Sequence, residues 1–169
     1  MVNLEQLVND PKGCGRKASQ LQRQIAVETI KARGLRGLKQ YGLFFTSFWL
    51  YGVVAPTRAR LIRSAYFWLR HIDDVADGDV QLPAEYAAAK YEYLENKLDL
   101  VRQLAQPEAS RYSAIPAEKI DVLLLDYLVA AKKLGISVFE ETLAILDTIK
   151  FDEERSRTRR APTQAELDD

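Results

Sequence analysis

Three aspartates follow an arginine at helical spacing near the middle of this chain: Arg70, Asp73, Asp74 and Asp77. At about 100° per residue they fall on one stripe of a helix, opposite an apolar stripe. Carboxylates of this kind suit Mg²⁺, which one or two carboxylates commonly share with a substrate's phosphate oxygens. The pattern therefore indicates a metal-assisted phosphate or diphosphate site. A solvated surface helix shows the same stripe, so the pattern alone leaves both interpretations open.

The residues upstream on the same helix favour the site. Tyr66 and Phe67 continue the acidic stripe toward Arg63. Aromatic side chains bury large areas and seek apolar surroundings, so a fully solvated face would seldom carry two of them. We therefore expect one side of this helix to pack on other helices and the other to line an apolar cavity with carboxylates at its mouth. Such a cavity suits a diphosphate with a hydrocarbon chain.

Residues 64–77 resemble the first aspartate-rich segment of the squalene/phytoene synthases, Y-x-x-x-R-x-x-D-D-x-x-D. Other pieces agree in order and approximate spacing, so the resemblance covers roughly residues 40–169. Upstream, Thr46-Ser47-Phe48 and Ala55-Pro56 are similar to the family's Ser-Phe and Leu-Pro segments. Downstream, Phe151-Asp152, Arg155 and the stretch from Thr163 to Leu167 are similar to its F-D-x-x-R and T-x-A-E-L segments. Each piece is weak alone, and the ordered set is specific.

The resemblance implies an all-α, isoprenoid-synthase-type helical bundle that condenses two prenyl diphosphates, farnesyl or geranylgeranyl, head to head. It implies Mg²⁺, or Mn²⁺, as the cofactor that assists loss of diphosphate. By this resemblance the metal ligands are Asp73, Asp74 and Asp77; the catalytic residues are Asp73, Asp77, Arg70 and Tyr66; and the substrate-binding residues are Ser47, Phe48, Phe67 and Arg70.

Two departures keep other functions open. Thr46 and Phe45 stand where the family usually has a basic residue and a serine, and the family's second aspartate-rich segment lies beyond Asp169. We therefore expect a bundle truncated before that helix, inactive by itself and inclined to self-associate. The acidic run 152–154 is more simply interpreted as a solvated helix face than as a substitute metal site. The alternatives are a non-catalytic relative that binds prenyl lipids or assists assembly, and a terpene cyclase or chain-elongating prenyl synthase.

Composition limits the remaining classes. The 169 residues contain 24 Lys and Arg against 24 Asp and Glu, so a nucleic acid partner is not expected. A single cysteine, Cys14, excludes an internal disulfide. Residues 42–55 are too short to span a bilayer and predict a buried core helix, with shallow membrane contact as the alternative. We expect a cytoplasmic protein, with peripheral membrane contact as the alternative.

Helix start and stop signals, together with hydrophobic periodicity, predict a flexible leader over residues 1–16 and one helical domain over 17–169. Pro56 and Pro83 are expected to open helices, and Gly78 and Gly135 to close them. The predicted helices are 17–33, 36–53, 57–78, 83–106, 116–134 and 137–153, with another beginning near 163.

Overall fold

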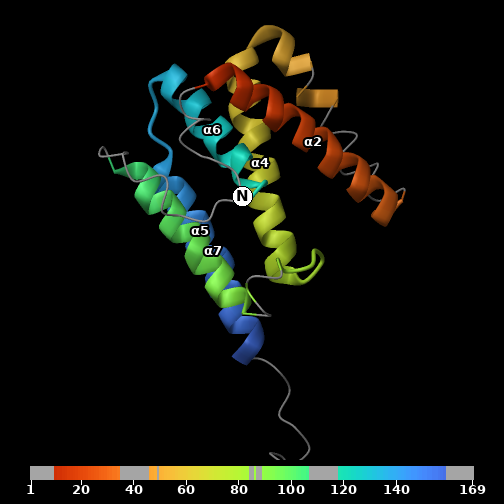
Figure 1. The fold of residues 1–169 in the computed structure, drawn as a ribbon, viewed down its shortest axis with the longest axis vertical. Helices are drawn as coiled ribbons and strands as arrows, with labels where there is room; N and C mark the ends of the chain where they lie inside the picture. The colour runs from red at the N-terminus through yellow and green to blue at the C-terminus, as the bar shows by residue number, and fades with distance from the viewer. Residues whose placement is uncertain are drawn as a thin grey trace, which may run out of the picture. The chain divides into compact units, whose positions relative to one another are not determined.

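A computed structural model describes residues 10–34, 46–48, 50–83, 86, 89–106 and 118–158, without the side chains of 32, 33, 157 and 158. All regular structure in these residues is helical, so the predicted all-α class is confirmed. The helices are α2 (Pro11–Arg33), α4 (Pro56–Asp77), α5 (Lys90–Ala105), α6 (Asp121–Leu134) and α7 (Phe139–Thr158) (Figure 1). The predicted helix near residue 163 and most of the one predicted over 36–53 lie outside the described residues.

Helix α2 begins six residues before its predicted start, so the predicted leader is wrong over residues 11–16. The side chain of Asp10 accepts the backbone N–H of Gly13 at 2.9 Å, and Pro11 occupies the first helical turn. Both are helix-start signals, because the cap satisfies an N–H that has no partner within the helix and proline needs none. Cys14, which the leader would have exposed, is fully buried.

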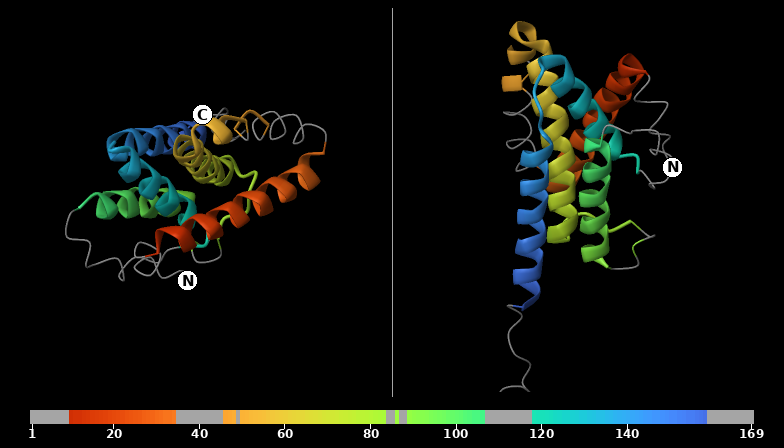
Figure 2. Two further views of the ribbon diagram at one scale, coloured as in Figure 1. Left: turned by 90° about the horizontal axis from the view of Figure 1, so that it is seen from above. Right: turned by 90° about the vertical axis from the view of Figure 1, so that its left-hand side faces the viewer.

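The chain divides into two compact units. The first contains Met1–His71 and Gln106–Val138, and the second contains Ile72–Ala105 and Phe139–Asp169. Helices α2 and α6 and most of α4 belong to the first unit, whereas α5, α7 and the last turn and a half of α4 belong to the second. In the first unit α2 packs on α6, and in the second α5 packs on α7 (Figure 2).

In the first unit, one face of α4 is joined to α6 by side-chain hydrogen bonds. Arg60 and Ser64 donate to Asp126, and the indole N–H of Trp68 donates to Asp121 at 3.0 Å. The three donors are four residues apart, so they share one side of α4. The first half of helix α6 is buried on all sides, with Asp121 through Tyr127 all buried.

The second unit is centred on α5, whose Tyr93, Leu94, Leu98, Leu100 and Val101 are fully or almost fully buried. The ammonium of Lys90, at the start of α5, donates to the carbonyl of Ala76 in the last turn of α4 at 2.6 Å. This cation near a helix C-terminus is favourable, because the last carbonyls carry partial negative charge.

The predicted helix ends are confirmed at Gly78 and Gly135, which adopt φ values of 83° and 68° after α4 and α6. The prediction that Pro83 opens a helix is wrong, since α5 begins at Lys90. The N–H of Tyr86 donates to the Pro83 carbonyl at 3.0 Å and that of Ala89 to the Tyr86 carbonyl at 2.7 Å. Bonds between residues three apart make tight turns that do not continue as an α-helix.

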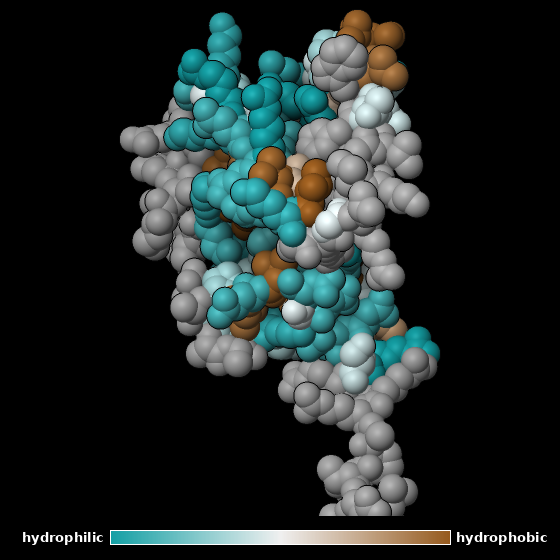
Figure 3. Space-filling model, turned by 90° about the vertical axis from the view of Figure 1, so that its right-hand side faces the viewer, coloured by the Kyte–Doolittle hydropathy of each residue, from teal (hydrophilic) through white to brown (hydrophobic). Residues whose placement is uncertain are grey.

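The described part of the segment predicted as a buried core helix is helical but exposed. Leu50, Val53 and Val54 keep 58%, 74% and 84% of their surface accessible, so the prediction of burial is wrong there. On the face drawn in Figure 3, hydrophilic residues predominate and hydrophobic ones form small separate groups. Among the helices of the described residues, none combines the length and apolarity that crossing a bilayer requires.

Candidate functional site

A polar hollow of about 280 Å³ lies in the second unit, where the end of α4 and the second half of α7 line it. Asp73 and Asp77 come from the predicted aspartate-rich segment, and Asp152 and Glu153 come from α7. The remaining lining residues are Ala76, Lys90, Ile149 and Ser156. The hollow therefore brings together two acidic pairs that are about 75 residues apart in the sequence.

Helical spacing explains how each element reaches the hollow. Asp73, Ala76 and Asp77 are related by steps of three and four residues, as are Ile149, Asp152, Glu153 and Ser156. Residues at these spacings occupy one face of a helix. Each helix thus contributes one face, and these faces carry four carboxylates.

The hollow carries a strongly negative formal charge. Four carboxylates and the single ammonium of Lys90 give −3 at neutral pH. That ammonium already donates to the Ala76 carbonyl, and this hydrogen bond holds it beside the last turn of α4. An arrangement of this charge attracts cations and repels a bare diphosphate.

Carboxylate oxygens are the ligands that Mg²⁺ prefers, and one or two of them per ion are enough when phosphate oxygens and water supply the rest. Within the described ranges, no three Asp, Glu, His or Cys side chains stand close enough to form a complete metal site. The donor chemistry of the hollow therefore fits Mg²⁺ shared with a bound phosphate, and does not fit an ion held by protein ligands alone.

Asp74, the third predicted metal ligand, is not among the lining residues of the hollow. It is only 6% exposed, and therefore belongs to the buried side of α4 rather than to the acidic stripe. Ala76, which is not part of the predicted acidic stripe, lines the hollow instead. The lining stripe therefore shares Asp73 and Asp77 with the predicted stripe but is displaced around α4, away from Asp74 and toward Ala76.

The other predicted site residues belong to the first unit. Phe67 is 1% exposed, and its ring meets that of Tyr66 edge to face with 5.7 Å between centroids. Arg70 is partly buried, Ser47 is exposed and Phe48 is half-buried. The expected cavity wall of Tyr66 and Phe67 is therefore not part of the acidic hollow, whose walls are polar.

Asp152 and Glu153 are the site residues that the sequence interpretation missed, because it assigned them to a solvated helix face. The available signal was the position of Asp152 in the F-D-x-x-R segment, together with a helical face that repeats through Glu153 and Ser156. Acidic residues beside basic ones are ordinary on helix surfaces, so local composition hid that signal.

A salt bridge joins α7 to α5 close to the face of α7 that lines the hollow. Lys150 donates to Glu95 on α5, and its ammonium lies 4.5 Å from the centre of the Tyr91 ring. The hydrogen bond from Lys150 lowers the pKa of Glu95, and the hydrogen bond with Glu95 raises the pKa of Lys150. Ile149, the residue next to Lys150, lines the hollow, so this contact between α5 and α7 lies beside the lining face of α7.

No family model, no curated protein and no solved structure was found to match this chain.

Proposed function

We propose that this chain carries the diphosphate-binding part of a prenyltransferase of the squalene/phytoene synthase type, on an isoprenoid-synthase-like helical fold. The observation that supports this most directly is the meeting of Asp73 and Asp77 with Asp152 at one hollow. These residues come from two separate segments for which the sequence resembles that family. If the resemblance were accidental, there would be no reason for these two segments to line the same hollow.

In the proposed reaction the acidic face binds the polar end of a prenyl diphosphate. Mg²⁺ bound there would supply Lewis-acid neutralisation of the leaving diphosphate. One or two of the lining carboxylates, Asp73, Asp77, Asp152 and Glu153, would hold that ion through their oxygens, and Lys90 at the start of α5 would donate to a phosphate oxygen. A formal charge of −3 makes diphosphate binding dependent on divalent cations.

The size of the hollow indicates which end of the substrate it can hold. A volume of about 280 Å³ accepts a hydrated ion and a diphosphate group but is too small and too polar for a farnesyl chain as well. The proposal therefore assigns only the diphosphate to this hollow. The roles that the resemblance implies for Tyr66, Phe67, Arg70, Ser47 and Phe48, which belong to the first unit, stay predictions and are not part of this proposal.

The test is binding of labelled farnesyl diphosphate by the full chain, with Mg²⁺ and with EDTA. We expect binding only with Mg²⁺, weakened about tenfold or more by Asp73→Asn or Asp152→Asn. Asp147→Asn is the matched control, since this exposed aspartate lies on α7 and does not line the hollow. Release of inorganic diphosphate on incubation would then report turnover.

The outcomes distinguish the alternatives. Prenyl diphosphate binding that ignores EDTA and Asp73→Asn alike would reject the proposal and favour the non-catalytic lipid-binding relative. Turnover of a single substrate to a cyclic product would favour the terpene cyclase. A longer linear product that keeps one diphosphate, formed when a second, homoallylic diphosphate is supplied, would favour the chain-elongating synthase. Equal loss of binding in Asp152→Asn and Asp147→Asn would show that the hollow has no special part in it.

A further inference from the structure

A second, basic groove lies in the first unit, where α2 and α4 line it. Its volume is about 630 Å³. Five of its eight lining residues are cationic, and no acidic residue is among them. The lining comprises Lys12, Gly15, Arg16, Ser19, Gln20 and Arg23 from α2, and Arg60 and Arg63 from α4.

Most of this positive charge is not neutralised within the described part of the chain. Arg60 pairs with Asp126, whereas no ion pair there involves Lys12, Arg16, Arg23 or Arg63. The Nε of Arg63 is buried and has no hydrogen-bond partner. A buried donor without an acceptor is unfavourable by itself, and Arg63, which carries this donor, is one of the lining residues of the groove.

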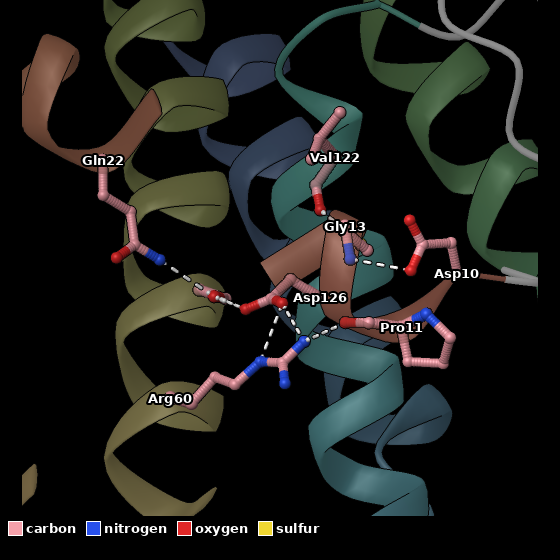
Figure 4. Close-up of polar contacts among 9 residues, drawn as sticks. Asp10, Pro11, Gly13, Gln22, Arg60, Val122 and Asp126 are labelled. Atoms are coloured by element: carbon pink, nitrogen blue, oxygen red, sulfur yellow. Dashed lines mark hydrogen bonds and ion pairs between the residues drawn. The ribbon is translucent and has the colours of Figure 1, made fainter. Parts of the chain in front are cut away.

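A buried polar network holds the two helices that form the groove (Figure 4). The side-chain amide of Gln22 on α2 donates to Ser64 on α4 at 2.9 Å, and Ser64 donates to Asp126 on α6 at 2.6 Å. Asp126 also accepts the Nε–H of Arg60 at 2.8 Å, and Arg60 donates to the Pro11 carbonyl at 3.1 Å. The guanidinium of Arg60 is therefore fixed at the base of the groove before any ligand arrives.

Close approach of α2 to this guanidinium depends on Gly15. A Cβ at that position would come within 2.8 Å of Arg60 Nη2. The groove is thus a site with a rigid base and exposed, longer side chains at its rim, where Lys12, Arg16 and Arg23 lie. Guanidinium groups held in this way favour phosphate, whose oxygens accept paired hydrogen bonds.

We propose that this groove binds a multiply charged phosphate group without a metal ion. It differs from the acidic hollow in sign, because it attracts the anion directly whereas the hollow needs a cation to do so. The phosphate can belong to a soluble compound or to a phospholipid headgroup. The volume suits a group of two or three phosphates rather than a polymer.

The experiment uses the full chain in EDTA and titrates inorganic tripolyphosphate by calorimetry. The double variant Arg16→Gln/Arg63→Gln removes two lining charges, and Lys17→Gln/Arg58→Gln removes two exposed charges from the same helices outside the groove. We expect the first to weaken binding about tenfold or more and the second to change it about twofold or less. Asp73→Asn/Asp77→Asn should bind normally, so failure of this proposal is separable from failure of the prenyltransferase proposal.

Phosphatidylcholine vesicles with and without phosphatidylinositol bisphosphate, whose headgroup carries three phosphates, identify the source of the phosphate. Displacement of tripolyphosphate by the anionic vesicles assigns a lipid headgroup, and indifference to them assigns a soluble phosphate. Circular dichroism checks folding, and if the double variant misfolds, Arg23→Gln compared with Lys31→Gln on the same helix repeats the test. Absence of binding in EDTA, or equal loss in the groove variants and their controls, would overturn the proposal.

Discussion

Asp126, only 1% exposed, accepts the Nε–H of Arg60 at 2.8 Å, joining α6 to α4. Ser64 donates to the other carboxylate oxygen at 2.6 Å. A buried carboxylate is tolerable only when its charge and its oxygens are satisfied, and these two residues meet most of that requirement. The contact between Arg60 and Asp126 therefore affects both the packing of the first unit and the position of Arg60 in the basic groove.

Arg60→Gln should destabilise the first unit strongly. The substitution leaves Asp126 buried with Ser64 as its remaining side-chain donor, and loss of one partner of such a pair costs about 3 kcal/mol or more. The free energy of unfolding from urea titration measures the effect. Arg58→Gln, an exposed arginine two residues earlier on α4, should change it by no more than about 0.5 kcal/mol. Similar values for the two variants would contradict the assigned role of Asp126.

Adjacent aspartates on α4 should respond in opposite ways. Asp74 is buried, so Asp74→Ala should lower the free energy of unfolding by about 1–3 kcal/mol, because its partners lose an acceptor. Asp73 lines the hollow, so Asp73→Ala should leave stability within about 0.5 kcal/mol and act on Mg²⁺-dependent binding. Urea unfolding and diphosphate binding of both variants check this. A stable Asp74→Ala protein that has lost Mg²⁺ dependence would restore Asp74 as a ligand.

The contact between Glu95 and Lys150 should contribute to stability over a defined pH range. The folded pKa of Glu95 lies below its ordinary value of 4.5, so its contribution is present above that pH and is lost as the pH falls further. The folded pKa of Lys150 lies above its ordinary value of 10.5, so its contribution is present below that pH and is lost as the pH rises. Both groups are partly exposed, so the pair contributes only about 0.2–1 kcal/mol.

Glu95→Gln should therefore lower thermal stability by a constant amount between about pH 5 and pH 10, with the difference shrinking on either side. Melting curves of the wild type and the variant over this range measure it, and Asp147→Asn serves as the exposed control on α7. A difference that grew toward acid pH would refute the assigned pairing.

Cys14 should be slow to react in the folded protein. Burial, followed by the nearby Asp126 charge, raises the pKa of its thiol from 9.0 to about 11, and the side chain is inaccessible. Its S–H lies 3.8 Å from the Val122 carbonyl. At pH 8 the lower thiolate fraction alone slows alkylation by iodoacetamide about a hundredfold relative to the protein in urea. Mass spectrometry of timed samples measures the rate, and equal rates would place Cys14 in an exposed segment as the sequence suggested.

Local sequence features predict the limits of α4 well. Pro56 and Gly78 mark the limits of α4 to within one residue, because first-turn prolines and left-handed glycines act through their own backbone conformations. Asp10 and Pro11 carry an equally local signal for the start of α2, six residues before the predicted start. The pairing of Asp73 with Asp77 on one face also needed only the helical repeat.

The sequence by itself determined the all-helical class, the approximate helices and the acidic pair at the end of α4, since each depends on neighbours within a few residues. Only the tertiary structure decided that Asp74 is buried, that Asp152 and Glu153 share a hollow with Asp73, and that Arg60 meets Asp126. The physical reason is that helical periodicity fixes which side chains share a face. Which face becomes buried, and which remains open, depends on packing against helices encoded far away in the chain.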